Sequence, residues 1–418
     1  MDLSDFVEDI EKKDFQKRRE LAKEKSYEVL QTIDINEYGE KLGEVRRNNG
    51  FVGESPSVFV SRSNYPNVQS GILSPLTDKN PQELVTNQNW YESNLSIQDI
   101  LGRRTSLMNS QKESDVDVYD VWDGYVGVQR EIALSDNPVS VDIDIEETSG
   151  VKPQLDNISS PTGPSASAMD ANLTENPHVP RPVKKVEEDD EWKSTEAVYY
   201  LYNKGFDVYQ LQDVFSTGTL GKKENRKLVP TRWSITAIDD MIGKKLRSEI
   251  KSNRFVNDTS VYYNSYIGNQ YWVIETPGQW EFELVEIKEP DSVWNPKKSG
   301  VSLSSAYENY TGRRKYVEET AGAYYASRLG ALENLDSEGR QSKYLIIRVV
   351  TDDYWAPTGV WQIRESVRNA FDNGSREFDD FNDAVTSVVE QTPVSLERLR
   401  RKSEMLSGVQ RSLEWFND

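Results

Sequence analysis

Basic side chains gather in one short part of the sequence, GKKENRKLVPTRWSITAIDD at residues 221–240. The segment runs into a helix with strong apolar periodicity, and the first turn of a helix leaves backbone N–H groups unpaired and carries a positive partial charge. Arginine side chains beside such a turn add bidentate hydrogen bonds to phosphate oxygens. The segment therefore predicts a phosphate or nucleic-acid site, unless its cations pair with the abundant carboxylates. These cations are Lys222, Lys223, Arg226, Lys227 and Arg232.

Two adjacent carboxylates, Asp239 and Asp240, follow in the same predicted helix. Paired carboxylates hold Mg²⁺ for phosphodiester chemistry when further carboxylates converge on them, and here Glu318 or Glu319 would have to do so, with Arg232 on the phosphate. No partner motif is readable, and acids near a helix N-terminus are also favoured by the helix dipole alone. The two aspartates are therefore weak catalytic candidates, and a Mg²⁺ cofactor is expected only if they act.

Two further basic groups lie in the C-terminal half. Arg313 and Arg314 follow a glycine in a predicted turn. Arg364 and Arg368 stand one turn apart on the helix that follows an aromatic and proline-containing turn, where they could reach a phosphate or an acid. Arg313, Arg314 and Arg364 therefore join the predicted nucleic-acid-binding residues.

The chain ends in VQRSLEWFND, directly after Gly408. Gln410, Leu413 and Phe416 are spaced three residues apart, so one helical turn brings an aliphatic and an aromatic side chain to one face. Such a peptide suits the apolar groove of a partner, and an exposed end of a chain reaches a partner freely. The alternative is an amphipathic end that packs on its own domain.

The composition limits the possible chemistry. The chain has 418 residues and a formal charge of −20, which opposes non-specific adhesion to nucleic acid and requires any such site to be local. Zero cysteines exclude thiol nucleophiles and cysteine-ligated metals, and a single histidine, His178, leaves almost no material for a catalytic triad. Without an apolar run long enough for a bilayer, we expect an intracellular, cytoplasmic protein with no membrane partner.

The elements that must position these residues follow from apolar periodicity. Residues 3–32 indicate a long charged helix with a thin apolar stripe. The clearest helix runs from Ser234, a suitable N-cap, to Ile250. The alternation of strands and helices in the second half indicates an α/β or α+β fold of mixed sheets with packed helices. Other helices are expected at residues 194–204, 317–335, 361–371, 377–391 and 395–407, and strands at residues 58–60, 271–276, 280–288 and 344–351.

Two segments invite a specific reading. In the strand at 280–288, Phe282 and Leu284 alternate with Glu281 and Glu283, which predicts one apolar and one polar face. Residues 149–183 are rich in Pro, Ser and Asn with little periodic apolar content, a composition typical of a linker.

Six stretches stand out by their order along the chain: SPSVFVSRSNYPNVQSGILSP, GPSA, NPHVPRPV, LVPTRWSITAIDD, GAYYASRLGALENL and DDYWAPTGVWQIRESVR. In this order they resemble the landmarks of the archaeal Nre family of DNA repair proteins. Six ordered matches are far more specific than one short motif. Because two of the landmarks lie within 149–183, the resemblance implies that this segment is ordered and extended along the surface.

The resemblance implies a two-part Nre body and a role in DNA repair beside the sliding clamp (PCNA), to which family members attach through a C-terminal clamp-interacting (PIP) motif. We therefore expect a helical extension at 1–50, body parts at 51–300 and 301–407, and a clamp-binding tail at 408–418. Gln410, Leu413 and Phe416 match the motif, while Asn417 replaces a second aromatic and Trp415 stands one place early. Many members also carry an N-terminal zinc-finger-like segment with cysteines, which this chain lacks.

These observations support one main hypothesis and two alternatives. The main hypothesis is a DNA repair accessory factor that binds DNA through the basic segments at 222–232 and 312–314 and is localised by the clamp. The first alternative is a metal-dependent phosphodiester-acting enzyme, such as a nuclease, that uses Asp239 and Asp240. The second is a protein that a virus has recruited for a structural role.

Overall fold

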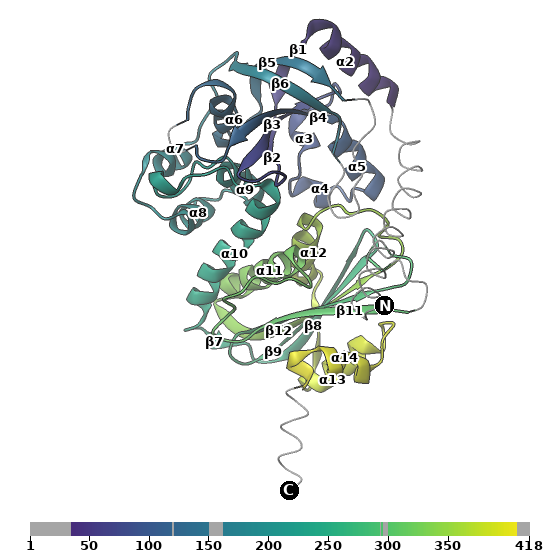
Figure 1. Cartoon of the computed structure of the whole chain (residues 1–418). Helices are drawn as coiled ribbons and strands as arrows, with labels where there is room; N and C mark the ends of the chain where they lie inside the picture. Colours follow the sequence, from purple (N-terminus) through teal and green to yellow (C-terminus); the bar gives the residue numbers. More distant parts are fainter. Residues whose placement is uncertain (1–34, 119–120, 150–161, 293, 296–299, 408–418) are drawn as a thin grey trace, which may run out of the picture. The chain divides into compact units, whose positions relative to one another are not determined.

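The computed structural model describes residues 35–118, 121–149, 162–292, 294–295 and 300–407. These residues form two compact units (Figure 1). The N-terminal unit contains the described residues up to Ile242, and the C-terminal unit begins at Gly243, so the division falls within α10 (Thr231–Ile250). The expected division at residues 300 and 301 follows the family's two parts and stays a prediction. The helix predicted at 3–32 lies outside the described residues.

A six-stranded sheet in the order β1-β5-β6-β4-β3-β2 is the base of the N-terminal unit. β4 and β6 pair in parallel, and the other neighbouring strands pair antiparallel. Along β5 the buried Val141 and Ile143 alternate with the exposed Asp142 and Asp144, which gives the sheet one core face and one solvent face. The strands are β1 (Gly50–Ser55), β2 (Ser57–Val60), β3 (Asn67–Pro75), β4 (Leu107–Asp115), β5 (Val139–Thr148) and β6 (Ser165–Leu173).

Helices α2 and α6 cover the core face of this sheet. Leu42 and Val45 of α2 and Ile132 of α6 belong to the same apolar cluster as the buried side chains of β5. α5 begins with a capping box in which Ser96 and Asp99 bond each other's backbone N–H groups. The helices are α2 (Ile35–Asn48), α3 (Pro81–Leu84), α4 (Asn89–Glu92), α5 (Ile97–Thr105), α6 (Gly124–Leu134), α7 (Arg181–Glu188), α8 (Ser194–Tyr202), α9 (Val208–Ser216) and the first part of α10.

The segment with linker-like composition belongs to the body of the N-terminal unit. Its residues 165–173 form β6, which lies between β5 and β4 in the sheet. Ala166, Ala168 and Ala171 are buried there, and such small side chains pack an inner strand without giving a strong apolar signal in the sequence. The expectation that the segment is ordered is confirmed for residues 162–183, although it supplies an inner strand and the start of α7 as well as surface chain; residues 150–161 lie outside the described residues.

The C-terminal unit contains a seven-stranded mixed sheet in the order β11-β10-β12-β9-β8-β13, with β7 paired to β12. β10 and β12 are parallel neighbours in its middle, and β12 is buried along most of its length. The predicted strands at 271–276, 280–288 and 344–351 are confirmed. The strands are β7 (Arg254–Phe255), β8 (Thr259–Tyr266), β9 (Asn269–Pro277), β10 (Glu281–Lys288), β11 (Ser302–Glu308), β12 (Arg340–Val350) and β13 (Ser375–Phe378).

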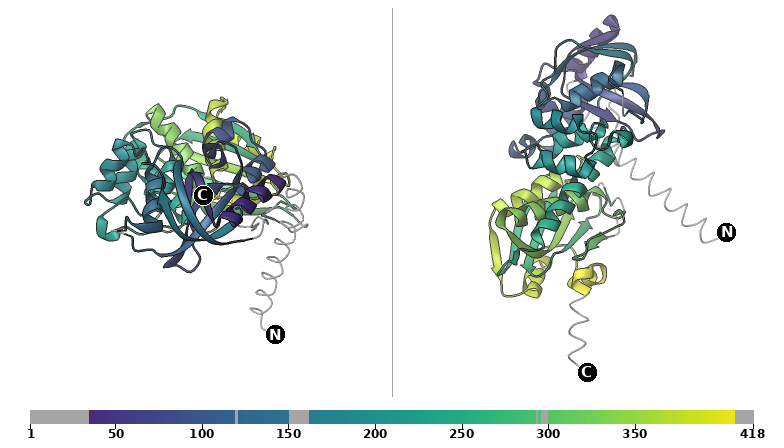
Figure 2. Two further views of the ribbon diagram at one scale, coloured as in Figure 1. Left: turned by 90° about the horizontal axis from the view of Figure 1, so that it is seen from above. Right: turned by 90° about the vertical axis from the view of Figure 1, so that its left-hand side faces the viewer.

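Helices cover both faces of this second sheet (Figures 1 and 2). On one face the rings of Phe282 and Tyr344 contact Tyr324 of α11 (Gly322–Glu338) and Phe371 of α12 (Trp361–Asp372), respectively. On the other face the apolar side chains of β10 and β12 form a core with α13 (Phe381–Val389) and α14 (Leu396–Lys402). The sequence-based fold class, mixed sheets with packed helices, is therefore confirmed.

Several boundaries differ from the predictions. α10 begins at Thr231, so Ser234 lies inside the helix, where its Oγ donates to the carbonyl of Gln212 at 2.6 Å instead of capping the first turn. Ile235 is half-buried, while Ile238 and Ile242 are fully buried as expected. α11 begins at Gly322, five residues after the predicted start at 317, and β13 occupies part of the helix predicted from 377.

The polar face predicted for β10 is wrong. Glu283 is fully buried, because α13, α14 and residues 403–407 cover the face that the alternation assigned to solvent. Its carboxylate accepts hydrogen bonds from the Ser403 hydroxyl at 2.6 Å and from the backbone N–H groups of Glu404 and Met405, each at 2.9 Å. Burial raises the pKa of Glu283, and these three donors oppose the rise. The glutamate thus fixes the chain just before residue 408.

Candidate nucleic-acid interface

The connection between α9 and α10 carries most of the predicted cations of the N-terminal unit. Backbone hydrogen bonds hold it in place: the N–H of Leu228 donates to the carbonyl of Val116, and the N–H of Val229 donates to the carbonyl of Ser216, both at 2.8 Å. Leu228 is buried in a small apolar cluster with residues of β2 and β3 and of the chain after β4. Gly218 has φ +67°, and a Cβ there would lie 2.6 Å from the carbonyl oxygen of Lys227, so the close approach needs glycine. The connection therefore has a defined course.

Arg226 fixes this connection from inside. Only 4% of the residue is exposed, its Nε donates to the carbonyl of Gly221 at 2.8 Å, and one terminal nitrogen donates to the carbonyl of Asp189 at 3.0 Å. The carboxylates of Glu187 and Asp190 each lie 3.8 Å from the guanidinium. Burial raises the pKa of Glu187, and the Arg226 charge opposes that rise. Arg226 is thus committed to the fold and does not belong to an exposed phosphate-binding surface, because a buried cation needs such partners.

The other cations of the connection reach its surface to different degrees. Lys222 and Lys223 are half-buried, while Lys227 and Arg232 are exposed. Lys227 pairs with Asp117 at 2.7 Å, and this hydrogen bond and charge raise its pKa, with smaller contributions from Tyr65 and Asp115. The alternative that cations of the segment pair with acids therefore holds for Arg226 and Lys227.

Sequence reasoning missed an aromatic pair beside these cations. The loop between β2 and β3 carries Tyr65, whose ring lies 5.3 Å from that of Trp233 in the first turn of α10, with the planes tilted by 51°. Tyr65 is 45% exposed and Trp233 is 47% exposed. A hydrogen bond of 2.9 Å from the N–H of Val60 to the hydroxyl of Thr231 ties the two segments together. The sequence held one signal for this pair: Trp233 lies in the first turn of α10 but outside the apolar stripe of that helix, so it was a candidate for an exposed ring.

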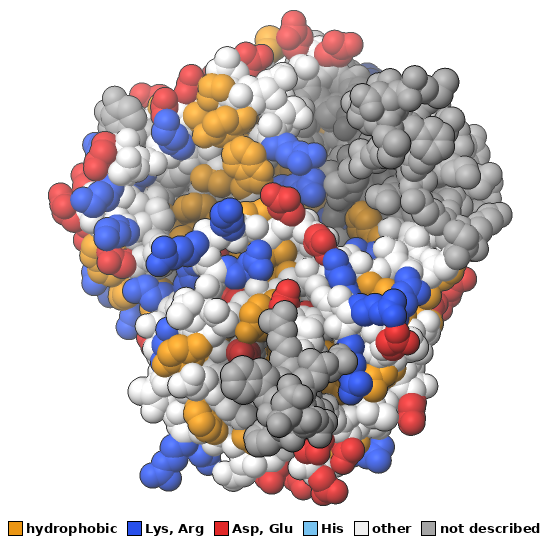
Figure 3. All heavy atoms as spheres, turned by 60° about the horizontal axis from the view of Figure 1, so that its bottom comes forward, with side chains coloured by type: hydrophobic (Ala, Val, Ile, Leu, Met, Phe, Trp, Pro, Cys, Tyr) orange, Lys and Arg blue, Asp and Glu red, His pale blue; other side chains and the backbone are white. Residues whose placement is uncertain are grey.

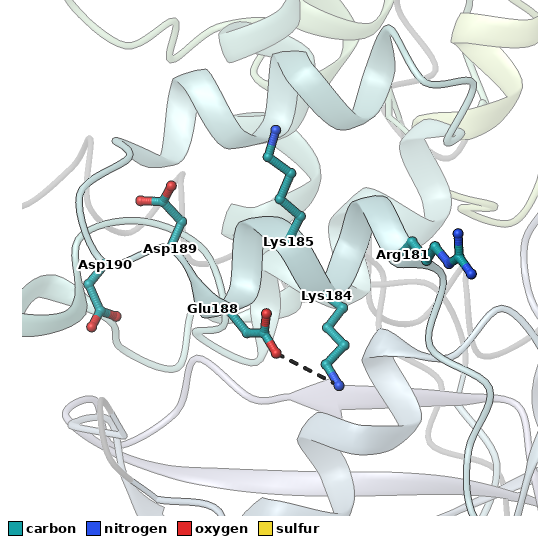
Figure 4. A pocket seen from close by; sticks show the side chains of 6 residues that line it. All are labelled: Arg181, Lys184, Lys185, Glu188, Asp189 and Asp190. Carbon is teal, nitrogen blue, oxygen red and sulfur yellow. Dashed lines mark ion pairs between the residues drawn. The ribbon is translucent and has the colours of Figure 1, made fainter.

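A shallow groove lies along α7 in the same unit (Figure 4). Its walls combine both signs of charge: Lys184 pairs with Glu188 at 3.7 Å, and Lys185 points toward the rings of Trp192 and Tyr200, 5.5 and 4.9 Å from their centres. These contacts use the lysines within the fold, so the groove is a weaker candidate for an anion site than the connection between α9 and α10. Its lining residues are Arg181, Lys184, Lys185, Glu188, Asp189 and Asp190.

The candidate cations of the C-terminal unit separate into exposed and buried groups. Arg313 and Arg314 are exposed in the turn after β11, where Arg313 donates to the carbonyl of Tyr307 at 2.7 Å. Arg364 is fully buried in α12 and is therefore not part of an exposed surface. Arg368 reaches an acid: two of its nitrogens contact the two carboxylate oxygens of Glu333, each at 2.7 Å.

The candidate catalytic acids do not form a metal site in the described part of the chain. Asp239 is fully buried, contrary to a reading as a surface acid, and Asp240 is half-buried; both interact within the fold. Glu319 pairs with Lys402 at 2.8 Å, and Glu318 is exposed. Among the described residues no three histidine or acidic side chains lie close enough to hold a metal ion. The carboxylate cluster required by the enzyme alternative is not found there.

Nδ1 of the exposed His178 lies 2.8 Å from the carboxylate of Asp136, a surface contact. Gln410, Leu413 and Phe416 lie outside the described residues. None of the described helices has the length and apolar content needed to cross a membrane. On the face drawn in Figure 3, Lys and Arg side chains form groups among acidic and apolar ones, so a net acidic chain still has locally basic surface.

Comparison with known proteins decides the family. Residues 21–295 match the model of the archaeal Nre N-terminal region, and residues 308–416 match that of the archaeal Nre C-terminal region. The chain belongs to the archaeal Nre family. The resemblance inferred from the six sequence landmarks is thus confirmed.

Three relatives are similar over most of their lengths. The DNA repair protein NreA of Haloferax volcanii is 49% identical over 98% of this chain and 98% of its own length. NreA of Archaeoglobus fulgidus is 36% identical over 80% of this chain and 83% of its own, and NreB of the same organism is 33% identical over 88% and 92%. No solved structure is significantly similar to the chain.

Proposed function

We propose that this Nre protein is a DNA repair accessory factor that binds DNA through its exposed basic segments and is brought to a sliding clamp by its C-terminal tail. The observation that carries the proposal is family membership, because relatives similar over most of the chain are named DNA repair proteins. The proposal includes no cofactor. It concerns a cytoplasmic protein with DNA and the clamp as partners.

The DNA-binding part is supported by the course of the chain between α9 and α10. Buried contacts fix its backbone, while Arg232 extends to the surface and Lys222 and Lys223 are partly accessible. A preorganised group of cations binds a phosphate backbone without first ordering a loop. In the C-terminal unit Arg313 and Arg314 supply a second exposed group.

DNA binding is tested by replacing one surface cation. Arg232→Gln is expected to weaken binding of duplex and branched DNA and to reduce the slope of log K against log salt by about 1, because one phosphate contact is lost. Lys79→Gln is the matched control, since it removes one exposed positive charge of the same unit at a distant position in the sequence. Equal affinities and equal slopes for both variants would contradict the proposed interface.

The tail is tested by comparing the full chain with a chain that ends at Gly408. The full chain is expected to bind the clamp, and the shortened chain to lose this binding while keeping its affinity for DNA. A full-length variant with Leu413→Ala and Phe416→Ala should behave like the shortened chain, because both replaced side chains are proposed to enter the apolar groove. Equal clamp affinity for all three proteins would reject the tether.

The enzyme alternative predicts that the protein turns DNA over, whereas the accessory role predicts binding without turnover. It requires divalent-dependent turnover of DNA that Asp239→Ala abolishes with binding intact. Asp239 is fully buried, and the described residues bring no further acids to it in a metal-binding group, so we favour the accessory role.

A further inference from the structure

The aromatic pair formed by Tyr65 and Trp233 brings two exposed rings into contact on the surface of the N-terminal unit. Most large aromatic side chains gain stability by burial, and two exposed rings in contact leave a continuous apolar area in water. Among the described residues, the other ring pairs in contact have at least one ring that is mostly covered. Tyr65 and Trp233 thus contact each other while each keeps nearly half of its surface exposed.

Both rings are held by well-anchored backbone. Tyr65 lies in the hairpin loop between β2 and β3, which is closed by a hydrogen bond from the N–H of Ser61 to Gln69 at 2.9 Å. Trp233 belongs to the first turn of α10, where its backbone N–H donates to the carbonyl of Pro230 at 2.7 Å. Since β2 and α10 are also joined by the hydrogen bond from Val60 to Thr231, hydrogen bonds anchor the backbone close to both rings. A fixed pair of rings needs little ordering when it binds a flat partner.

The charged side chains near the aromatic pair are mainly cations, which favours an anionic binding partner. Arg62 is exposed in the same loop as Tyr65, and Arg232 is exposed next to Trp233. Lys227 adds a third cation near Tyr65, although Asp117 pairs with it at 2.7 Å and Asp115 lies close by. Flat apolar rings beside cations suit a strand of unpaired nucleotides, because bases stack on the rings while the phosphates meet the cations. Duplex DNA keeps its base faces inside the stack and cannot use the rings.

We propose that Tyr65 and Trp233 form a stacking platform for the unpaired bases of single-stranded DNA, with Arg62, Lys227 and Arg232 along the phosphate backbone. This inference rests on the proposed DNA-binding function and names the form of DNA that the N-terminal unit recognises. Two family landmarks far apart in sequence, residues 55–75 and 228–240, meet at this platform. The substrate class is therefore DNA with an exposed single-stranded stretch.

The test measures binding of the full chain to a labelled thymidine strand of about 16 nucleotides, the upper range for one single-strand site. Trp233→Ala and Tyr65→Ala are each expected to weaken binding roughly 5- to 150-fold, because one base–ring contact is lost. Trp233→Phe and Tyr65→Phe should stay within about threefold, since both keep a ring. Phe255→Ala, which removes a ring that is 46% exposed in the other unit, is the control and should bind like the original protein.

A second probe separates stacking from charge. An abasic strand of the same length keeps the phosphates but offers no bases, so the original protein should bind it more weakly than Trp233→Ala binds the thymidine strand, because the contacts to both rings are lost. Duplex affinity should be the same in the ring variants and in the original protein. Unchanged affinity of both alanine variants, or equal binding of abasic and thymidine strands, overturns the platform.

Other outcomes identify another occupant and also overturn the proposal. RNA of the same sequence that binds more than tenfold more tightly than DNA would assign the platform to RNA. A dimer of the chain that dissociates in the alanine variants, with single-strand affinity intact, would assign it to a second copy. If the original protein binds no DNA of any form, the proposed function fails as well; if duplex binding depends on Arg232 while the ring variants are neutral, the platform alone fails.

Discussion

Asp213 links the stability of the N-terminal unit to pH. It lies in α9, and its carboxylate accepts a hydrogen bond of 2.6 Å from the hydroxyl of Ser57 in β2. Burial raises the pKa of Asp213 to about 7, with the Ser57 hydrogen bond opposing the rise and Asp207 adding to it. In the same helix, the backbone carbonyl of Gln212 accepts a hydrogen bond from the Ser234 hydroxyl of α10. α9 therefore supports the start of α10 and with it the candidate interface.

The sign of the effect follows from proton release. Below about pH 4 the carboxyl is protonated in the folded and the unfolded chain, and it causes no loss of stability. Between about pH 4 and 7 the unfolded chain releases a proton that the folded chain keeps, so the free energy of unfolding decreases as pH rises. Above about pH 8 the decrease is complete. Full burial would give about 4 kcal/mol for a rise of about three pKa units, and residual exposure of the side chain reduces our expectation to about 2 kcal/mol.

Asp213→Asn should remove this dependence, because asparagine keeps an oxygen acceptor for Ser57 and has no charge. We expect the variant to exceed the original protein by only about 1 kcal/mol at pH 5 and by about 2 kcal/mol at pH 8.5, where the midpoint of thermal unfolding of that unit rises by roughly 4–8 °C. The assay is thermal and urea unfolding at several pH values, with Asp144→Asn, an exposed aspartate of β5, as the control. A stability difference between Asp213→Asn and the original protein that stays constant from pH 5 to 8.5 would refute the reasoning.

Three further predictions concern the supports of the two units. Glu308→Gln should cost about 3–5 kcal/mol in urea unfolding, because Arg328, 2.7 Å away and buried, loses its counter-charge; a loss below about 1 kcal/mol would contradict this. Glu283→Gln should weaken the hold on residues 403–405 by about 1–2 kcal/mol and accelerate tryptic cleavage after Lys402, and an unchanged cleavage rate would count against that role. Gly218→Ala should lower stability by more than about 1 kcal/mol, since the position has φ +67° and a Cβ would meet the carbonyl of Lys227; a neutral effect on urea unfolding would reject the close approach.

The regular elements were predictable where one physical signal dominated. The spacing of Ile238, Ile242 and Leu246 allows only a helix with a buried stripe, and the apolar run at 344–351 has the length and composition of an inner strand. β6 was not predicted, because its buried side chains are alanines, which give only a weak apolar signal in the sequence. Glu283 was misassigned because alternation reveals a second face of a strand but not whether helices later cover that face.

The candidate site was only partly predictable for a related reason. The sequence identified the basic connection, but the burial of Arg226 depends on carbonyl and carboxylate groups of residues 187–190, which the sequence does not place beside it. The contact between Tyr65 and Trp233 likewise joins two distant segments. Local patterns report on neighbours along a helix or strand, whereas a site assembled from several segments needs the tertiary structure.

The net charge of the chain explains why the two exposed rings would matter for the proposed binding of DNA. With a formal charge of −20, the chain as a whole repels a polyanion, and some local cations, such as Lys227, are already paired with acids. Salt screens the remaining attraction between cations and phosphates, but it does not weaken the stacking of bases on rings. The proposed interface, which combines few accessible cations with two exposed rings, should therefore keep affinity for unpaired DNA at salt concentrations that release non-specific duplex contacts. Selectivity for single-stranded DNA should consequently rise with salt, and it should do so only while both rings are present.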